Sequence, residues 1–371
     1  MPLARDLPAI TLPTAPVDLG TRLATFAEAE AQPTTGRVLR ALPAAARDFR
    51  AELKASGRPE YVGTFDLYTF PYPKEFGLWR AAFTPAPFLV ITNRLLVVRW
   101  HDGDGRRRTL LFEPSDVDLG YNTPYFADLA ARTPPPLRAA LVTRHGGVLE
   151  HLARLGVAPE EVDYLVYDHL HTQDVRRWIG TTTPQPDLSL DAPVAPAFPN
   201  ARLVVQRREL EAMCDLHPLQ RPWYQVPTFV DLRPEGLAPI EGDVLLGPGV
   251  ALLSTPGHTL GNQSLVLNTD SGIWVSSENA VAAECMTPEH SRIPGVARWA
   301  SRWGQEVVLN ANTLEAMAEQ YNSMIKEKHV ADTSRDGRFV QFLPSSELTR
   351  SRIAPGAGPT VTHLGISHGS L

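Results

Sequence analysis

Three β-rich runs of this sequence each end in side chains that can bind a metal ion, and this feature constrains the fold more than any other. The run Val162–Tyr167 leads into Asp168–Asp174, which reads DHLHTQD, the run at 250–255 leads into Pro-Gly-His258, and the run at 272–276 leads into Ser-Glu-Asn279. Two histidines one residue apart on a turn can point into one cleft, because the turn breaks the alternation of faces. Imidazole and carboxylate ligands suit zinc, iron or manganese. The pattern therefore predicts a metal site where several strands end.

The segments around these runs predict an α/β chain. A helix is expected over 148–155, where apolar residues repeat at helical spacing and Gly156 follows as a natural C-cap. The runs at 61–70, 88–100 and 108–113 are rich in β-formers and are separated by turn residues, which predicts a meander of antiparallel strands.

The division into domains follows from a change in composition. Residues 1–60 are rich in alanine and proline, with one amphipathic stretch from Arg37 to Lys54, and are interpreted as an N-terminal extension. Residues 61–371 are predicted to form one domain with long loop insertions at 176–249 and 280–310. Trp223 and Tyr224 lie in the first insertion and are expected to wall a substrate pocket or to join the core.

Composition excludes several classes of protein. The chain of 371 residues is 43% hydrophobic and 20% charged, close to globular averages. No apolar run approaches the ~18 residues of a membrane helix, and the start of the sequence lacks the apolar region of a secretory signal. The net charge of −6 disfavours nucleic-acid binding, and two cysteines, Cys214 and Cys285, favour a reducing cytoplasm. We expect a small-molecule substrate and neither a nucleic-acid nor a membrane partner, and a homodimer is left open.

Two blocks of the sequence resemble the metallo-β-lactamase superfamily. Leu149–Asp174 (LEHLARLGVAPEEVDYLVYDHLHTQD) is similar to its helix–strand–HxHxDH unit. Phe198–Val205 (FPNARLVV), Gly242–Asp243 and Thr255–Ser264 (TPGHTLGNQS) are similar to the block that follows, in a lactonase-like pattern. The resemblance covers roughly residues 61–328. It implies an α/β (α+β) fold, the αββα sandwich, with a metal site at one edge of the sheets.

The resemblance also implies a set of metal ligands. His169 and His171 match the first two ligands of the family, and His258 matches the third. Glu278 falls where the family has a carboxylate that contacts one or two metals, and Asn279 beside it is a further candidate.

The last histidine of the family follows a helix and a strand further along the chain. A capping-box pattern at Asn312–Glu315 begins a predicted helix that reaches Lys328. His329, at the end of this helix, is the best placed candidate, and His363 and His368 are alternatives.

The sequence departs from the family pattern at three positions. Gln173 and Asp174 stand where the family has an aspartate and a histidine that hold a second metal. This implies one tightly held metal, unless Asp174 restores a site for two. Asp168 stands where the family commonly has threonine or serine, and it either binds the metal or orients a histidine. The Asp-His pair is similar to that of the hydrolytic dehalogenase branch typified by chlorothalonil dehalogenase.

These observations together predict a metal-dependent hydrolase of a small ester, lactone or related electrophile. One or two zinc ions, or iron or manganese, would lower the pKa of a bound water to give hydroxide near neutral pH. Asp168 or Asp174 would orient this water or accept its proton, and Glu278 and Asn279 would complete the site. Two alternatives remain: a hydrolytic dehalogenase of activated aromatic chlorides, and a non-catalytic ligand-binding member of the fold. Substrate, metal identity and oligomeric state are left open.

Overall fold

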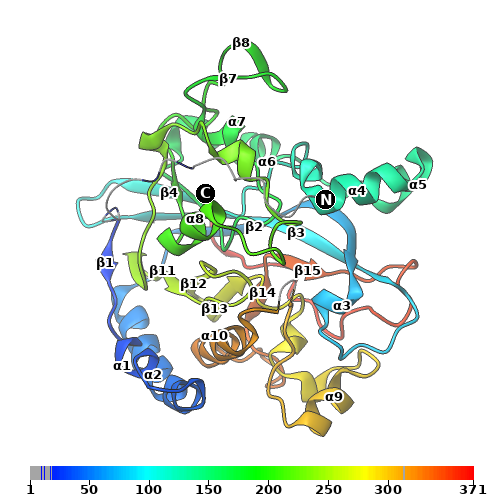
Figure 1. Cartoon of the computed structure of the whole chain (residues 1–371). Helices are drawn as coiled ribbons and strands as arrows, with labels where there is room; N and C mark the ends of the chain where they lie inside the picture. The colour runs from blue at the N-terminus through cyan, green and yellow to red at the C-terminus, as the bar shows by residue number, and fades with distance from the viewer. Residues whose placement is uncertain (1–9, 11, 13–16, 18, 312–313) are drawn as a thin grey trace.

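Two β-sheets face each other and carry helices on their outer faces (Figure 1). The computed structural model describes residues 10, 12, 17, 19–311 and 314–371. In Figure 1, α2 and α10 lie on one side of the two layers of strands, and α6 and α8 lie on the other. The predicted αββα sandwich is therefore confirmed.

Both sheets mix local and distant pairings. The first sheet runs in the order β1 (Thr21–Arg22), β10 (Val244–Gly247), β11 (Val250–Ser254), β12 (Gln263–Thr269), β13 (Gly272–Ser277) and β14 (Phe342–Pro344). The second runs in the order β16 (His368–Gly369), β2 (Tyr61–Pro73), β3 (Phe88–His101), β4 (Arg107–Phe112), β6 (Tyr164–Val166) and β9 (Arg202–Val204). Beside this path, β15 (Ser346–Leu348) pairs with β3 and β5 (Thr143–Arg144) pairs with β2. The predicted antiparallel meander is β2–β3–β4.

The remaining elements cover the sheets or project from them. The helices are α1 (Ala27–Glu30), α2 (Thr35–Ser56), α3 (Lys74–Gly77), α4 (Pro124–Arg132), α5 (Pro135–Leu141), α6 (Val148–Leu155), α7 (Arg176–Ile179), α8 (Arg207–Cys214), α9 (Val296–Trp303) and α10 (Met317–Val330). A hairpin of β7 (Pro184–Gln185) and β8 (Ser189–Pro193) projects from the molecule at the top of Figure 1. Among the described helices, none has both the length and the apolar character needed to cross a membrane.

Apolar side chains fill the three interfaces between the layers. Leu96 of β3 and Leu265 of β12 belong to the cluster between the two sheets. Leu253 of β11 packs with Phe49 of α2 in the cluster on the outer face of the first sheet. Leu152 of α6 belongs to the corresponding cluster on the second sheet. The alternation of strand side chains between two buried faces explains why these strands are almost entirely apolar.

The observed bounds of α6 and α10 can be compared with the bounds that the sequence predicted for these two helices. The helix α6 ends at Gly156, which has φ 69° in the left-handed region, as the C-cap prediction requires. The helix predicted from Asn312 begins only at Met317, and Asn312 itself lies outside the described residues. The segment 20–56 packs closely on the sandwich, because β1 pairs with β10 and α2 packs on α10. The domain boundary at residue 60 stays a prediction.

Candidate metal centre

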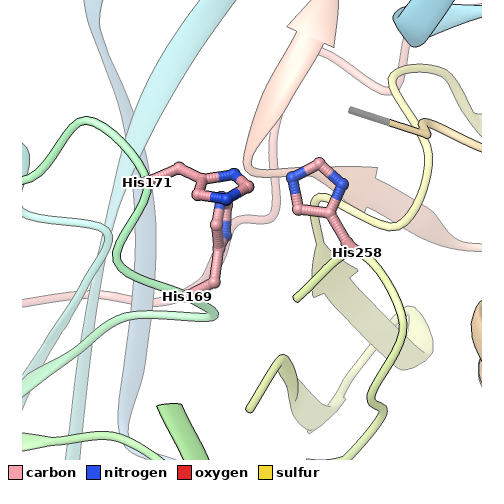
Figure 2. A group of neighbouring side chains, drawn as sticks. All are labelled: His169, His171 and His258. Atoms are coloured by element: carbon pink, nitrogen blue, oxygen red, sulfur yellow. The ribbon is translucent and has the colours of Figure 1, made fainter. Parts of the chain in front are cut away.

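Three buried histidines from two loops converge on one point (Figure 2). His169 and His171 follow β6, and His258 follows β11. The ring centroid of His169 lies 4.6 Å from the ring centroid of His171 and 4.6 Å from that of His258. The ring centroids of His171 and His258 are 5.1 Å apart. One nitrogen of each ring lies within 4.8 Å of the others. Among the described residues, this is the one group of histidine, cysteine and carboxylate side chains with metal-ligand spacing.

Two buried nitrogens of this group have no hydrogen-bond partner. Nε2 of His171 bonds to Oε1 of Gln220 at 2.7 Å, and its Nδ1 is left unpaired. Nδ1 of His258 bonds to the carbonyl oxygen of Asn310 at 2.9 Å, and its Nε2 is left unpaired. Leaving a buried polar atom unpaired costs about 1–3 kcal/mol, whereas an imidazole nitrogen is a good ligand for zinc. The residues present therefore fit a divalent metal ion such as zinc.

Asp168 contacts His169, the remaining histidine of the group. Its Oδ1 is hydrogen bonded to Nδ1 of His169, and its Oδ2 accepts a hydrogen bond from Oγ of Ser345 at 2.7 Å. The backbone N–H of Asp168 donates to Oε1 of Glu113 at 2.6 Å. Both carboxylate oxygens are thus engaged by side chains. Of the two roles that the sequence left open, this geometry favours orientation of a metal-binding histidine over direct ligation.

The charge of Asp168 also controls the protonation of the histidines. Burial alone would lower the pKa of His169, but the charge and hydrogen bond of Asp168 outweigh burial and raise this pKa to about 9. Burial, aided by the charge of His169, lowers the pKa of His258 to about 3. Burial and the two neighbouring histidines likewise hold the pKa of His171 well below its usual value. His171 and His258 are therefore neutral at pH 7, and neutral imidazole is the form that binds metals. His169, whose pKa is raised, has to release a proton when it binds a metal.

Replacing Asp168 by asparagine is expected to weaken zinc binding by about 10–100-fold, the usual effect of losing an outer partner of a ligand. Asparagine can still accept a hydrogen bond from His169, but it lacks the negative charge that makes the imidazole more basic. The dissociation constant is measured by competition with a coloured chelator. Asp243→Asn is the control, because Asp243 is also buried but pairs with Lys326. Parental zinc affinity in Asp168→Asn would contradict the assignment.

Glu278 faces the same small cavity as His169 and His171. Burial raises the pKa of the Glu278 carboxyl group to about 7, with His169 opposing this shift and Asp168 adding to it. The backbone oxygen of Glu278 accepts a hydrogen bond from Nδ2 of Asn310 at 3.0 Å, which fixes the loop after β13. The sequence-predicted carboxylate therefore lies beside the histidines.

Asn279 lies deeper in the protein. Its Nδ2 donates to the backbone oxygen of Thr255 at 3.2 Å and to Oε1 of Glu327 at 3.1 Å. Its Oδ1 is buried and unpaired, but Asn279 is not among the residues that line the cavity at the histidines. A structural role explains these contacts, and the role of Asn279 as a metal ligand stays a prediction.

Gln173 and Asp174, which stand at the second-metal positions of the family, are both engaged by other side chains, although Gln173 also lines the small cavity at the histidines. Nε2 of Gln173 donates to Oγ of Ser115 at 2.9 Å. The carboxylate of Asp174 is fully buried and pairs with the guanidinium of Arg176, with Nε–Oδ1 at 3.0 Å and Nη2–Oδ2 at 2.6 Å. Arg176 thus engages both oxygens of Asp174 in a buried ion pair. This geometry favours a structural role, and a role of Asp174 at the metal stays a prediction.

His329 lies apart from the three histidines, exposed near the end of α10. Partial burial and the charge of Lys328 lower its pKa. A strand, β14, does follow this helix, as in the family pattern, but the residue after it is Ser345, which bonds to Asp168. His363 bonds to the backbone oxygen of Val340. His368 bonds to the backbone oxygen of Pro59 and pairs with Asp270, and none of these later histidines belongs to the group with metal-ligand spacing.

A large apolar cavity adjoins the small cavity at the histidines. It has a volume of about 510 Å³ and is lined by residues of β2, α4 and α5. Both cavities share four lining residues: Tyr68, Phe70, Phe126 and Thr172. Trp223 lines the smaller one, as the sequence suggested for the first insertion. The metal site thus lies beside a space suited to an apolar group.

Sequence reasoning identified Asp168 beside His169 but missed the groups that orient His171 and His258. Gln220 lies in the proline-rich insertion and has no local signal that links it to His171. The carbonyl oxygen of Asn310 is a backbone atom, which no pattern of side chains can reveal. Ser345 was missed too, although its place directly after the run at 342–344 is a signal of the same kind as those that identified the other candidates.

Comparisons with known proteins agree with this geometry. No family model matches the chain. A segment of 129 residues, 35% of this chain, is 32% identical to an N-acyl homoserine lactonase of Bacillus thuringiensis, and 30% identical over 129 residues to one of Bacillus cereus. The match spans only 42% of the length of these relatives.

A comparison of structures extends the likeness to most of the chain. A crystal structure described as a probable metal-dependent hydrolase from Staphylococcus aureus superposes with a TM-score of 0.52 at 14% sequence identity. The alignment covers 85% of this chain and 99% of that one. The relatives and this neighbour are hydrolases, as the sequence predicted for the present chain. The likeness shows that the chain has the fold that the sequence predicted, the αββα sandwich of the metallo-β-lactamases.

Proposed function

We propose that this protein is a zinc-dependent hydrolase that cleaves a small ester or lactone bearing an apolar substituent. The observation that carries the proposal is the meeting of three buried imidazoles, two with unpaired nitrogens, beside an apolar cavity of about 510 Å³. His169, His171 and His258 would hold the metal. A bound zinc ion would act as a Lewis acid and lower the pKa of water towards about 7.

The residues around the histidines have separate tasks in this proposal. Asp168 keeps the ring of His169 in place, and Gln220 does the same for His171. Because a hydrogen bond to one ring nitrogen fixes the tautomer, the other nitrogen is ready to bind the ion. Glu278 is the carboxyl group in the cavity, and we assign it the task of accepting or returning a proton.

The adjoining apolar cavity supports a substrate with a hydrophobic tail. Its lining is mostly apolar, with Arg138 as the charged exception, and it adjoins the small cavity at the histidines, where a carbonyl group would react. The partial likeness to N-acyl homoserine lactonases favours a lactone as the reacting group. Burying each methylene of such a tail contributes about 0.8 kcal/mol, so a cavity of this size would favour long tails over short ones.

The direct test is hydrolysis by the zinc-loaded protein of lactones and aryl esters that differ only in acyl length. We expect turnover that rises in kcat/KM with acyl length. An activated aryl chloride is included, because chloride release without ester cleavage would favour the dehalogenase alternative. Stoichiometric zinc with no turnover of any member of the panel would contradict the proposal and favour a ligand-binding protein.

A substitution that fills the cavity is expected to remove this length preference. Ala130 of α4 lines the cavity, whereas Ala127 of the same helix is exposed and does not. Ala130→Trp should exclude about two methylene groups and so lower kcat/KM for long acyl chains about tenfold, with little change for acetyl substrates. Ala127→Trp is the matched control and should leave both values unchanged. Equal losses on short and long substrates would show that the cavity does not hold the tail.

A further inference from the structure

Glu209 connects the two loops that carry the candidate metal ligands. It lies in the first turn of α8 and is fully buried. Its Oε1 accepts hydrogen bonds from the backbone N–H of Leu170 at 2.8 Å and from the hydroxyl of Tyr224 at 2.7 Å. Its Oε2 accepts from the hydroxyl of Thr259 at 2.6 Å and from the backbone N–H of Gly261 at 3.2 Å. One carboxylate thus joins three separate segments of the chain.

The positions of these donors relate Glu209 to the metal site. Leu170 lies between His169 and His171, and Thr259 directly follows His258. The two histidine loops are therefore held by opposite oxygens of the same rigid group. Any displacement of this carboxylate changes the distance between the first two ligands and the third.

The helix α8 and the loop that carries His258 are in close backbone contact, so neither can move independently of the other. A Cβ atom added to Gly261 would lie 2.3 Å from the backbone nitrogen of Glu209 and 2.4 Å from its Cα. Such distances are far below van der Waals contact, so only glycine permits the loop to approach the helix this closely. The backbone of the helix and the backbone of the loop thus fix the position from which the Glu209 side chain extends.

The four donors to Glu209 are neutral. They comprise two backbone amides and two hydroxyls, and the ion pairs found in the described part of the chain do not include Glu209. A buried carboxylate is costly unless its hydrogen bonds are complete, and hydrogen bonds to a charged acceptor are stronger than neutral ones. The full set of donors therefore gives a rigid connection between the loops.

We propose that Glu209 is a positioning residue that sets the spacing of His169 and His171 relative to His258 and thereby the affinity for the metal. This inference depends on the metal site described under Proposed function. Glutamine at this position keeps the shape of the side chain but presents N–H groups to two of the four donors. We expect Glu209→Gln to weaken zinc binding by about 10–100-fold, the range for partners that orient metal ligands.

The control is Glu284→Gln, which tests whether loss of a buried carboxylate is sufficient. Glu284 is fully buried, and it accepts hydrogen bonds from the hydroxyls of Ser291 and Thr360 and from the backbone N–H of Thr360. These partners belong to neither histidine loop. Both variants should lose thermal stability, but only Glu209→Gln should lose zinc affinity, measured by chelator competition at a temperature where all proteins are folded.

A milder pair of substitutions applies if Glu209→Gln does not fold. Thr259→Val removes one donor and keeps the branched shape, whereas Thr259→Ser keeps the hydroxyl. Weaker zinc binding in Thr259→Val with parental binding in Thr259→Ser supports the proposal.

The outcomes separate this inference from the metal site itself. If the parent protein binds no zinc, the proposed function fails and this inference fails with it. If the parent binds zinc, parental affinity in Glu209→Gln, or in Thr259→Val, overturns the role of Glu209 alone. An equal loss of affinity in Glu284→Gln also overturns it, because the effect would then follow general stability.

Discussion

Alanine in place of His258 is expected to abolish zinc binding and hydrolysis together while the sandwich still folds. His258 supplies one of three ligand nitrogens, and its Nε2 is buried with no protein partner. The core of the fold does not depend on it, because the apolar clusters are built from strands and helices on either side. The loss of affinity should exceed the about 100-fold that removal of an outer partner can cost. Metal content, circular dichroism and turnover are measured on the same preparation.

His329→Ala is the matched control for this substitution. His329 was a candidate from its place in the sequence, but it is exposed near the end of α10. Its removal should change neither zinc content nor activity. A second observable is thermal stability: saturating zinc should raise the melting temperature of the parent and of His329→Ala, but not that of His258→Ala. Full zinc occupancy in His258→Ala would contradict the assignment of the third ligand.

The sequence was most informative where local pattern determines structure. The helix over 148–155 with Gly156 as its C-cap was predicted to the residue, because spacing and the left-handed preference of glycine are local properties. The β-rich runs that end in His171, His258 and Glu278 were also recognised, and their ends do meet beside one cavity. Strand ends that meet in a sandwich convert positions far apart in the sequence into neighbours in space.

The sequence did not reveal which side chains pair, whether the partners are near or far apart along the chain. Asp174 has the right chemistry for a metal ligand, but its pairing with Arg176 depends on the direction of the turn before α7. Asp168 was correctly singled out, yet its bond to Ser345 crosses 177 positions of the chain. A buried carboxylate needs such partners, because burying an isolated charge costs free energy and a paired or hydrogen-bonded charge avoids most of that cost. The sequence identifies the charge but not the partner.

Removal of zinc by a chelator is expected to abolish hydrolysis, and a single equivalent of zinc per chain is expected to restore it fully. Hard second-site ions prefer anionic oxygen ligands. Gln173 offers a neutral amide that already donates to Ser115, and the carboxylate of Asp174 is neutralised by Arg176. Metal-free protein is titrated with zinc while bound metal and initial rate are both recorded, and the two curves should break together at one equivalent.

Two features could limit the site to a single ion: the neutral amide of Gln173 and the pairing of Asp174 with Arg176. A substitution distinguishes them. Gln173→Asp restores the missing carboxylate but leaves Asp174 paired with Arg176. The curves of bound zinc and initial rate should therefore still break at one equivalent of zinc. Asp174 cannot be released without cost, because loss of Arg176 would leave a buried carboxylate unpaired, at about 3–5 kcal/mol. Two equivalents bound tightly by the parent protein would refute the one-metal site. Two bound only by Gln173→Asp would show instead that the missing charge at position 173, and not the Asp174–Arg176 pair, excludes the second ion.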